Sequence, residues 1–119
     1  MKRGEVWWTA GDERFALVVL SVRGDEVRGL RVVEAANVDL TGIALELVIG
    51  AEEGVSPAGV LRVALPQPGR IMCSWLYTVD ASDLTGRAGM LAADKLVELD
   101  HMLEVARLDQ LARLSEETA

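Results

Sequence analysis

The chain of 119 residues contains one cysteine, Cys73, and one histidine, His101. A single cysteine excludes an internal disulfide, which favours a reducing compartment. One cysteine and one histidine are also too few for a zinc site built from these ligands. We therefore expect no metal ion, and no motif in the sequence implies another cofactor.

Long apolar runs are missing as well. No stretch approaches the roughly 20 apolar residues that cross a bilayer. The basic residues at positions 2–3 are not followed by the apolar segment of a signal peptide. We expect a soluble, cytoplasmic protein with no membrane partner.

Positive charge is scarce, because 12 Lys and Arg residues stand against 19 Asp and Glu residues, for a net charge of −7. Affinity for phosphate comes from basic side chains, so a strongly basic nucleic-acid binder is excluded, whereas a local binding surface is not. No nucleophile–base–acid set, glycine-rich phosphate loop or pair of metal-binding carboxylates stands out.

The hydrophobic half of the composition is enough for one domain with its own core, over residues 1–119. Short β-prone segments separated by turn residues predict strands in the first three quarters of the chain. These expected strands are residues 6–9, 15–22, 27–35, 41–49, 60–65 and 70–79. Residues 23–26 (RGDE) have the composition of a hairpin turn.

Near residue 92 the apolar period changes to that of a helix, which we expect to run to about residue 114. Asp94 can cap this helix, and Val97, Met102 and Val105 would widen its apolar stripe. Strands followed by one helix predict an α+β fold, in which a helix covers a twisted antiparallel sheet or a partly open barrel.

Two adjacent tryptophans, Trp7 and Trp8, lie on the first expected strand. Side chains alternate along a strand, so the two rings must face opposite sides. One ring should lie in the core. The other either packs under a loop or forms a dimer or ligand surface, since an exposed tryptophan is costly unless it is covered.

Four segments resemble the MazF/PemK family of toxins from bacterial toxin–antitoxin pairs. Residues 2–8 (KRGEVWW) resemble the opening of the family, and residues 15–21 (FALVVLS) its second strand, usually Arg-Pro followed by Val, Leu or Ile. Residues 76–80 (LYTVD) resemble an Ile-Arg-Thr-Val-Asp segment. Residues 84–89, with the helix start at 94–100, resemble the closing pattern of a glycine-containing turn and a helix.

The resemblance implies a small SH3-like antiparallel β-barrel with a long C-terminal helix, the fold of the CcdB and PemK toxins. It also implies a homodimer that cleaves single-stranded RNA at short specific sequences, as a metal-independent endoribonuclease. A cognate antitoxin protein would inhibit it by laying an extended tail in the RNA groove. No cofactor is implied, because the 2′-hydroxyl of the RNA attacks its own phosphate.

The family's catalytic residues are an arginine before the second strand and a Thr or Ser after the third. Here an alignment without gaps puts the family arginine on Phe15, and a one-residue bulge would bring Arg14 into its place. The equivalent of the hydroxyl falls on Ala36, and Thr41 is the next hydroxyl downstream. We therefore predict Arg14 and Thr41 as catalytic residues. The alternative for Arg14 is a solvent-exposed loop arginine paired with Asp12 or Glu13.

Trp8 and Thr78 are the residues that we expect to contact RNA. Two other functions stay open. The chain could be a catalytically inactive binding module of the same fold that acts through a protein partner, or a degenerate toxin that only pairs with its antitoxin. The departures at Phe15 and Ala36, together with the acidic balance, favour these readings.

Overall fold

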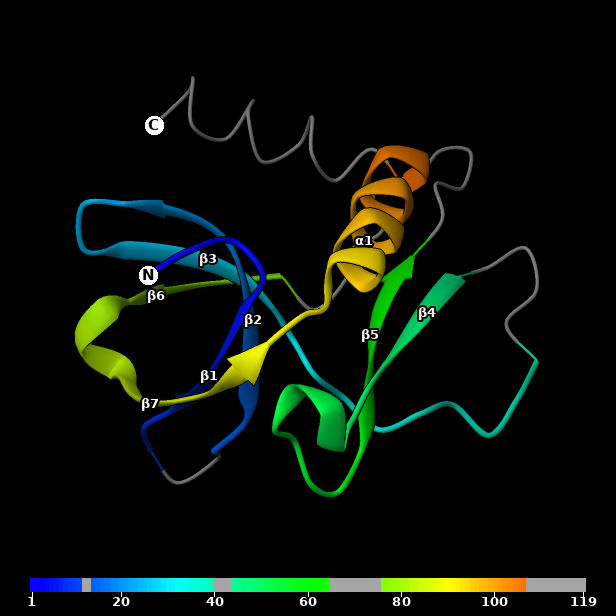
Figure 1. Ribbon diagram of the computed structural model, residues 1–119, viewed down its shortest axis with the longest axis horizontal. Coiled ribbons are helices and arrows are strands. Elements are labelled where there is room, and N and C mark those ends of the chain that lie inside the picture. Colours follow the sequence, from blue (N-terminus) through cyan, green and yellow to red (C-terminus); the bar gives the residue numbers. More distant parts are fainter. Residues whose placement is uncertain (12–13, 40–43, 65–75, 107–119) are drawn as a thin grey trace.

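The computed structural model describes residues 1–11, 14–39, 44–64 and 76–106 of the chain. In this part the order is seven strands, two 3-10 turns and one α-helix (Figure 1). The strands are β1 (Glu5–Thr9), β2 (Ala16–Arg23), β3 (Glu26–Arg31), β4 (Ala44–Ile49), β5 (Gly59–Ala64), β6 (Leu76–Asp80) and β7 (Leu84–Met90). The 3-10 turns are Ala51–Glu53 and Ala81–Asp83, and the helix is α1 (Ala93–Ala106).

Five strands form one antiparallel sheet in the order β6-β3-β2-β1-β7, while β4 and β5 form a separate two-stranded sheet. Within the described residues β6 and β7 do not pair with each other, so the five-stranded sheet is open and does not close into a barrel. The α+β fold with an antiparallel sheet and a C-terminal helix is thus confirmed.

The hairpin between β2 and β3 forms where the turn residues predicted it. Arg23 pairs with Glu26, which leaves Gly24 and Asp25 as a two-residue loop. Gly24 has a φ of +61°, a conformation that glycine adopts without steric cost.

A short bridge connects the two sheets. Val33, just after β3, pairs with Val60 in β5, and each amide donates to the other's carbonyl, at 2.9 and 2.7 Å. The expected strand over residues 27–35 therefore ends at Arg31, and only Val33 continues the pairing. This bridge brings the end of β3 beside β5.

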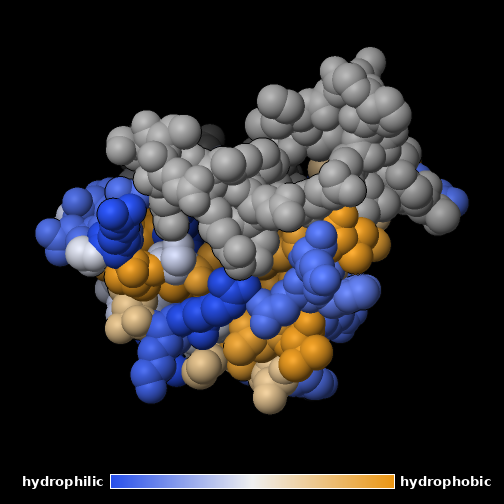
Figure 2. Space-filling view, turned by 90° about the horizontal axis from the view of Figure 1, so that it is seen from above, coloured by the Kyte–Doolittle hydropathy of each residue, from blue (hydrophilic) through white to orange (hydrophobic). Residues whose placement is uncertain are grey.

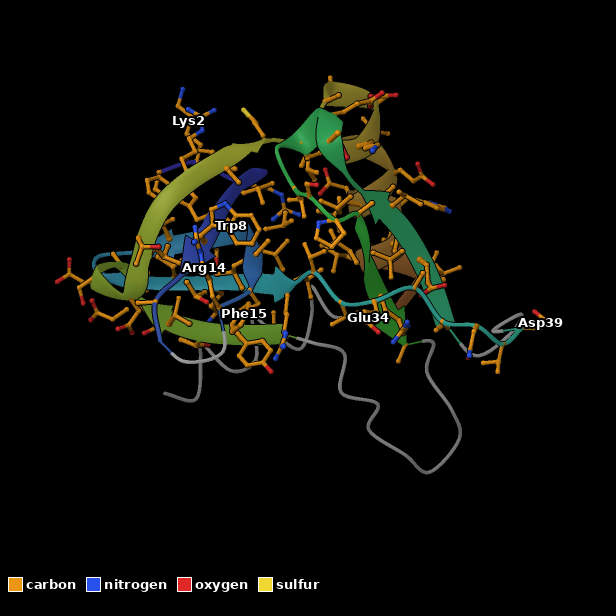
Figure 3. All side chains as sticks on the ribbon, turned by 90° about the horizontal axis from the view of Figure 1, so that it is seen from below. Lys2, Trp8, Arg14, Phe15, Glu34 and Asp39 are labelled. Atoms are coloured by element: carbon orange, nitrogen blue, oxygen red, sulfur yellow. The ribbon has the colours of Figure 1, made fainter. Side chains whose placement is uncertain are left out.

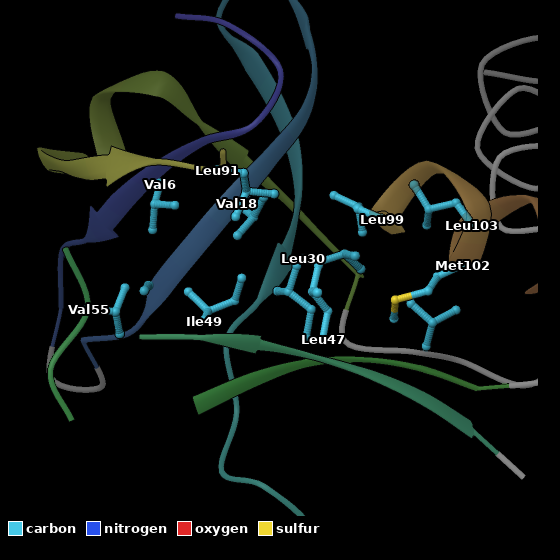
Figure 4. Close-up of a cluster of buried hydrophobic side chains, with 13 residues drawn as sticks. Val6, Val18, Leu30, Leu47, Ile49, Val55, Leu91, Leu99, Met102 and Leu103 are labelled. Carbon is cyan, nitrogen blue, oxygen red and sulfur yellow. The ribbon is translucent and has the colours of Figure 1, made fainter. Parts of the chain in front are cut away.

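The main core lies between the five-stranded sheet, the β4–β5 hairpin and α1 (Figure 4). Its buried members come from all three parts of the fold and include Val6, Val18, Leu30, Leu47, Ile49, Leu61, Leu99 and Met102. A second cluster, built on Leu17, Val19, Val27 and Leu84, covers the other face of the sheet. Alternation of side chains along β1 and β2 supplies both clusters from the same strands.

The helix packs by a narrower stripe than the sequence predicts. Leu99, Met102 and Leu103 are buried, whereas Val97 is 69% exposed and Val105 is 43% exposed. The expectation that three residues widen the stripe is therefore confirmed for Met102 and wrong for the two valines. Asp94 lies in the first turn of α1 rather than at its cap, where a carboxylate still favours the positive end of the helix dipole. The expected extension to residue 114 lies outside the described residues.

Strand β7 was not expected, because residues 84–89 read as a turn in the family resemblance. They form an edge strand that pairs with β1, with register shifts at two points. Three of its seven residues, Gly86, Ala88 and Gly89, are poor strand formers, so pairing with β1 rather than strand propensity produces it.

Figure 2 shows the molecule from above the view of Figure 1. On this face hydrophilic side chains separate two hydrophobic areas. Among the described helices, none is long and apolar enough to span a membrane.

Candidate nucleic-acid interface

A groove of about 590 Å³ lies at the end of the five-stranded sheet where β1 ends, β2 begins and β3 ends. Trp8 and residues 14–16 line one side, and residues 31–34 continue the lining. The opposite wall is residues 55–59, which lead from the 3-10 turn Ala51–Glu53 into β5, and Arg62 on β5. Residues far apart in the sequence therefore meet in one concave surface.

Three arginines line this groove, Arg14, Arg31 and Arg62, and one acidic side chain lines it, that of Glu34. Among the described lining residues the balance of charge is positive, although the chain carries a net charge of −7. Guanidinium groups present planar sets of donors that match phosphate oxygens. The groove is therefore suited to an anionic ligand that the rest of the molecule would repel.

Two aromatic rings lie beside two of these arginines. The Arg14 Cζ atom lies 4.8 Å from the centroid of the Trp8 ring, and the Arg31 Cζ atom lies 4.5 Å from that of Phe15. Both distances are typical of cation–π contacts. Figure 3 shows Trp8, Arg14 and Phe15 close together on one side and Glu34 on the other. Rings alternating with cations are the elements that bind unstacked nucleobases and their phosphates.

Tyr77 on β6 extends the aromatic set behind Phe15. The two ring centroids are 5.2 Å apart at an interplanar angle of 45°, and Arg31 Nη1 donates a hydrogen bond to the Tyr77 hydroxyl at 3.4 Å. Register brings these residues together, since Leu17 pairs with Arg31 and Gly29 with Tyr77. The Arg31 guanidinium is thus oriented by the Phe15 ring and by the Tyr77 hydroxyl.

Arg62 is held by acceptors on β4 and on the segment that follows β3. Its Nε and Nη2 donate to the Glu46 Oε2 atom at 3.0 and 2.9 Å, and Nη2 also donates to the Glu34 carbonyl oxygen at 2.8 Å. Glu46 neutralises much of its charge, yet within the described residues no hydrogen bond uses its Nη1 atom. Arg62 is therefore a fixed donor rather than a free cation.

The 55–59 wall is anchored by an ion pair whose carboxylate is buried and whose lysine, Lys95, is partly exposed. Glu53 is 1% exposed, and its Oε1 atom accepts from the Gly50 amide at 3.1 Å and from Lys95 Nζ. Lys95, on α1, also donates to the Val48 carbonyl oxygen at 2.9 Å. The helix thus holds the start of the groove wall in place.

Of the predicted site residues, Arg14 and Trp8 both line the groove. Arg14 precedes β2, so strand alternation does not govern the direction of its side chain. Thr78 is exposed and pairs with Arg28, three residues before Arg31 and about 10 Å along the strand, outside the lining. Thr41 lies outside the described residues. Ser56 is the hydroxyl within the described lining.

Arg31 and Arg62 were missed by sequence reasoning, which had no local signal for either. In the described residues no group of His, Cys, Asp and Glu could hold a metal ion, and the cysteine at position 73 lies outside them. Compared with known proteins, the chain matches no family model, no curated protein and no solved structure.

Proposed function

We propose that the chain is the toxin of a bacterial toxin–antitoxin pair of the MazF/PemK type, a metal-independent endoribonuclease that cuts single-stranded RNA at specific sequences. The supporting observation is the groove, where three arginines and two aromatic rings gather in a chain of net charge −7. A duplex would hide its bases, whereas the rings of Trp8 and Phe15 suit bases that are free to stack.

Guanidinium groups would do most of the catalytic work. When the 2′-hydroxyl attacks the adjacent phosphate, negative charge grows on the phosphorane oxygens, and donors fixed in advance stabilise that charge. Arg14 is oriented by Trp8, and Arg31 by Phe15 and Tyr77, so both are pre-organised. The proposed chemistry therefore draws its electrostatic stabilisation from side chains of this chain.

The family resemblance also suggests a more specific fold, an oligomeric state and a protein partner. We propose the SH3-like arrangement shared with the gyrase-poisoning CcdB toxins, a homodimer, and an antitoxin whose extended acidic tail occupies the groove. The order of strands followed by a helix supports the first of these. The positive lining supports an acidic competitor of RNA.

A cleavage assay tests the enzymatic proposal. Purified protein is incubated in EDTA with a long single-stranded RNA, beside Arg14→Ala and the control Arg23→Ala, whose exposed arginine lies in the β2–β3 hairpin. We expect cuts at a few defined sites, a loss of about 100-fold or more with Arg14→Ala, and no change with Arg23→Ala. A folded wild type that cuts none of several unrelated RNAs contradicts the proposal.

A binding module without catalysis is the second candidate. The observation that favours it is the missing hydroxyl at Ala36, with only Ser56 within the described lining. This candidate predicts that the groove binds an acidic peptide or RNA without cutting it. An RNA that binds the protein and is recovered uncut after long incubation would support it.

A further inference from the structure

Glu34 holds a position that the proposed function has not used. It follows the Val33–Val60 bridge directly, and its carbonyl oxygen accepts from Arg62 Nη2 at 2.8 Å. Two contacts with β5 therefore hold the backbone here, one through the preceding residue and one through the Glu34 carbonyl oxygen. Its side chain is exposed and lines the groove, and Figure 3 shows it apart from Trp8, Arg14 and Phe15.

The carboxylate of Glu34 is available for chemistry. Within the described residues it accepts no hydrogen bond and forms no ion pair, although three arginines line the same groove. Arg62 already forms an ion pair with Glu46. A phosphate held by the open Nη1 of Arg62 would lie next to Glu34, because Arg62 is bonded to that residue's own backbone.

We propose that Glu34 is the proton acceptor of the reaction; this inference rests on the proposed endoribonuclease function. The carboxylate takes the proton of the ribose 2′-hydroxyl as the 2′-oxygen forms its bond to phosphorus. The bond from phosphorus to the 5′-oxygen breaks, and that oxygen takes a proton from water. The products are a 2′,3′-cyclic phosphate and a 5′-hydroxyl, and no oxidant or metal enters the balance.

A carboxylate in a phosphate-binding groove has two opposed effects. Its negative charge repels the RNA backbone, so it weakens binding. As a general base in reach of the attacking hydroxyl it accelerates the reaction, by about 10²- to 10⁴-fold. A surface glutamate without a catalytic role has the first effect only, and this difference in sign separates the two roles.

The experiment uses the full-length protein and two oligonucleotides. One is a short RNA that spans a site cut by the wild type, and the other carries a 2′-deoxy sugar at that site and cannot react. We measure the single-turnover cleavage rate on the first and the dissociation constant for the second. The variants are Glu34→Gln, Glu34→Asp and the control Glu98→Gln, an exposed carboxylate on α1.

We expect Glu34→Gln to lower the cleavage rate by about 10²-fold or more, while it binds the 2′-deoxy oligonucleotide as tightly as the wild type or more tightly. Glu34→Asp should keep part of the rate, and Glu98→Gln should change neither quantity. A Glu34→Gln protein that cleaves at the wild-type rate overturns the inference, as does one that loses binding in proportion to rate. A wild type that cuts no RNA overturns the proposed function together with this inference.

Discussion

The Arg14 guanidinium lies over the indole ring of Trp8, with its Cζ atom 4.8 Å from the ring centroid. The second tryptophan, Trp7, packs against the cluster on the other face of the sheet, so the two adjacent rings serve opposite sides of one strand. Trp8 thus joins the main core to the groove, and Arg14 is fixed by a residue whose own position is fixed by packing.

Removing the Trp8 ring should weaken binding of single-stranded nucleic acid. Stacking of one base on an aromatic side chain contributes about 1–3 kcal/mol, so Trp8→Ala should raise the dissociation constant about 5- to 150-fold. Binding of a non-cleavable oligonucleotide, followed by fluorescence anisotropy, measures this change. Trp8→Phe keeps a ring over which Arg14 can lie and should retain most of the affinity; equal losses in the two variants would count against stacking.

The salt dependence of binding should report the arginines of the groove. Each phosphate neutralised on a single strand adds about −0.7 to the slope of log K against log salt concentration. We expect Arg14→Ala to make this slope shallower by about 0.7, and the same for Arg31→Ala. Arg23→Ala in the distant hairpin should leave the slope unchanged. An unchanged slope for Arg14→Ala would show that its guanidinium contacts no phosphate.

The ion pair behind the groove wall should be important for stability. Lys95→Met leaves the Glu53 carboxylate buried without its charged partner, and breaking a buried pair in this way costs about 3 kcal/mol or more. Urea unfolding measures the loss in the free energy of unfolding. Lys2→Met, at an exposed lysine, is the matched control.

The double variant Lys95→Met with Glu53→Gln should recover much of that stability, since it removes the unpaired charge. If the single and the double variants unfold at the same urea concentration, the pair does not act as the geometry indicates.

The pH dependence of Asp80 should follow from its contacts with Ser82. The amide of Ser82 donates to Asp80 Oδ1 at 2.9 Å and the hydroxyl donates to it at 2.8 Å, and these bonds lower the pKa of Asp80 from its ordinary value of 3.8. A lowered pKa means that this contribution to stability is complete above the unfolded-state pKa and is lost as the pH falls through the folded-state value.

Ser82→Ala removes the hydroxyl donor and keeps the amide donor, so the pKa of Asp80 should rise part of the way towards its ordinary value. Titration of the Asp80 carboxyl by NMR measures this shift. Ser56→Ala, in the groove wall, should leave it where it was. A pKa of Asp80 that does not move in Ser82→Ala would assign the whole effect to the backbone donor.

Sequence reasoning predicts the parts of the fold that depend on local patterns. Alternation along residues 44–49 predicts which side of β4 is buried, and Leu47 and Ile49 are buried while Val48 is 58% exposed. The turn at Gly24 and Asp25 forms as predicted because two small turn residues separate two β-prone segments. These features need no knowledge of distant contacts.

The groove could be predicted only in part, because its residues meet through pairing between strands. Arg14 and Trp8 stand near each other in the sequence, in a region that resembles a family motif. Arg31 reaches the groove through the register of β3 against β2, and Arg62 through the Val33–Val60 bridge. No pattern within either segment predicts these pairings, so neither arginine could be assigned to a site from sequence alone.

Gly54 and Gly89 show how little freedom the groove wall has. A Cβ atom at Gly54 would lie 2.0 Å from the Ala88 carbonyl oxygen, and one at Gly89 would lie 2.4 Å from the Glu53 carbonyl oxygen. Glu53 and Gly54, the residues just before the wall, therefore contact β7 through backbone atoms, so no substitution of a side chain changes this contact. Among natural variants of this chain, we expect both positions to remain glycine while the residues that line the groove diverge, so that ligand preference can evolve on an invariant frame.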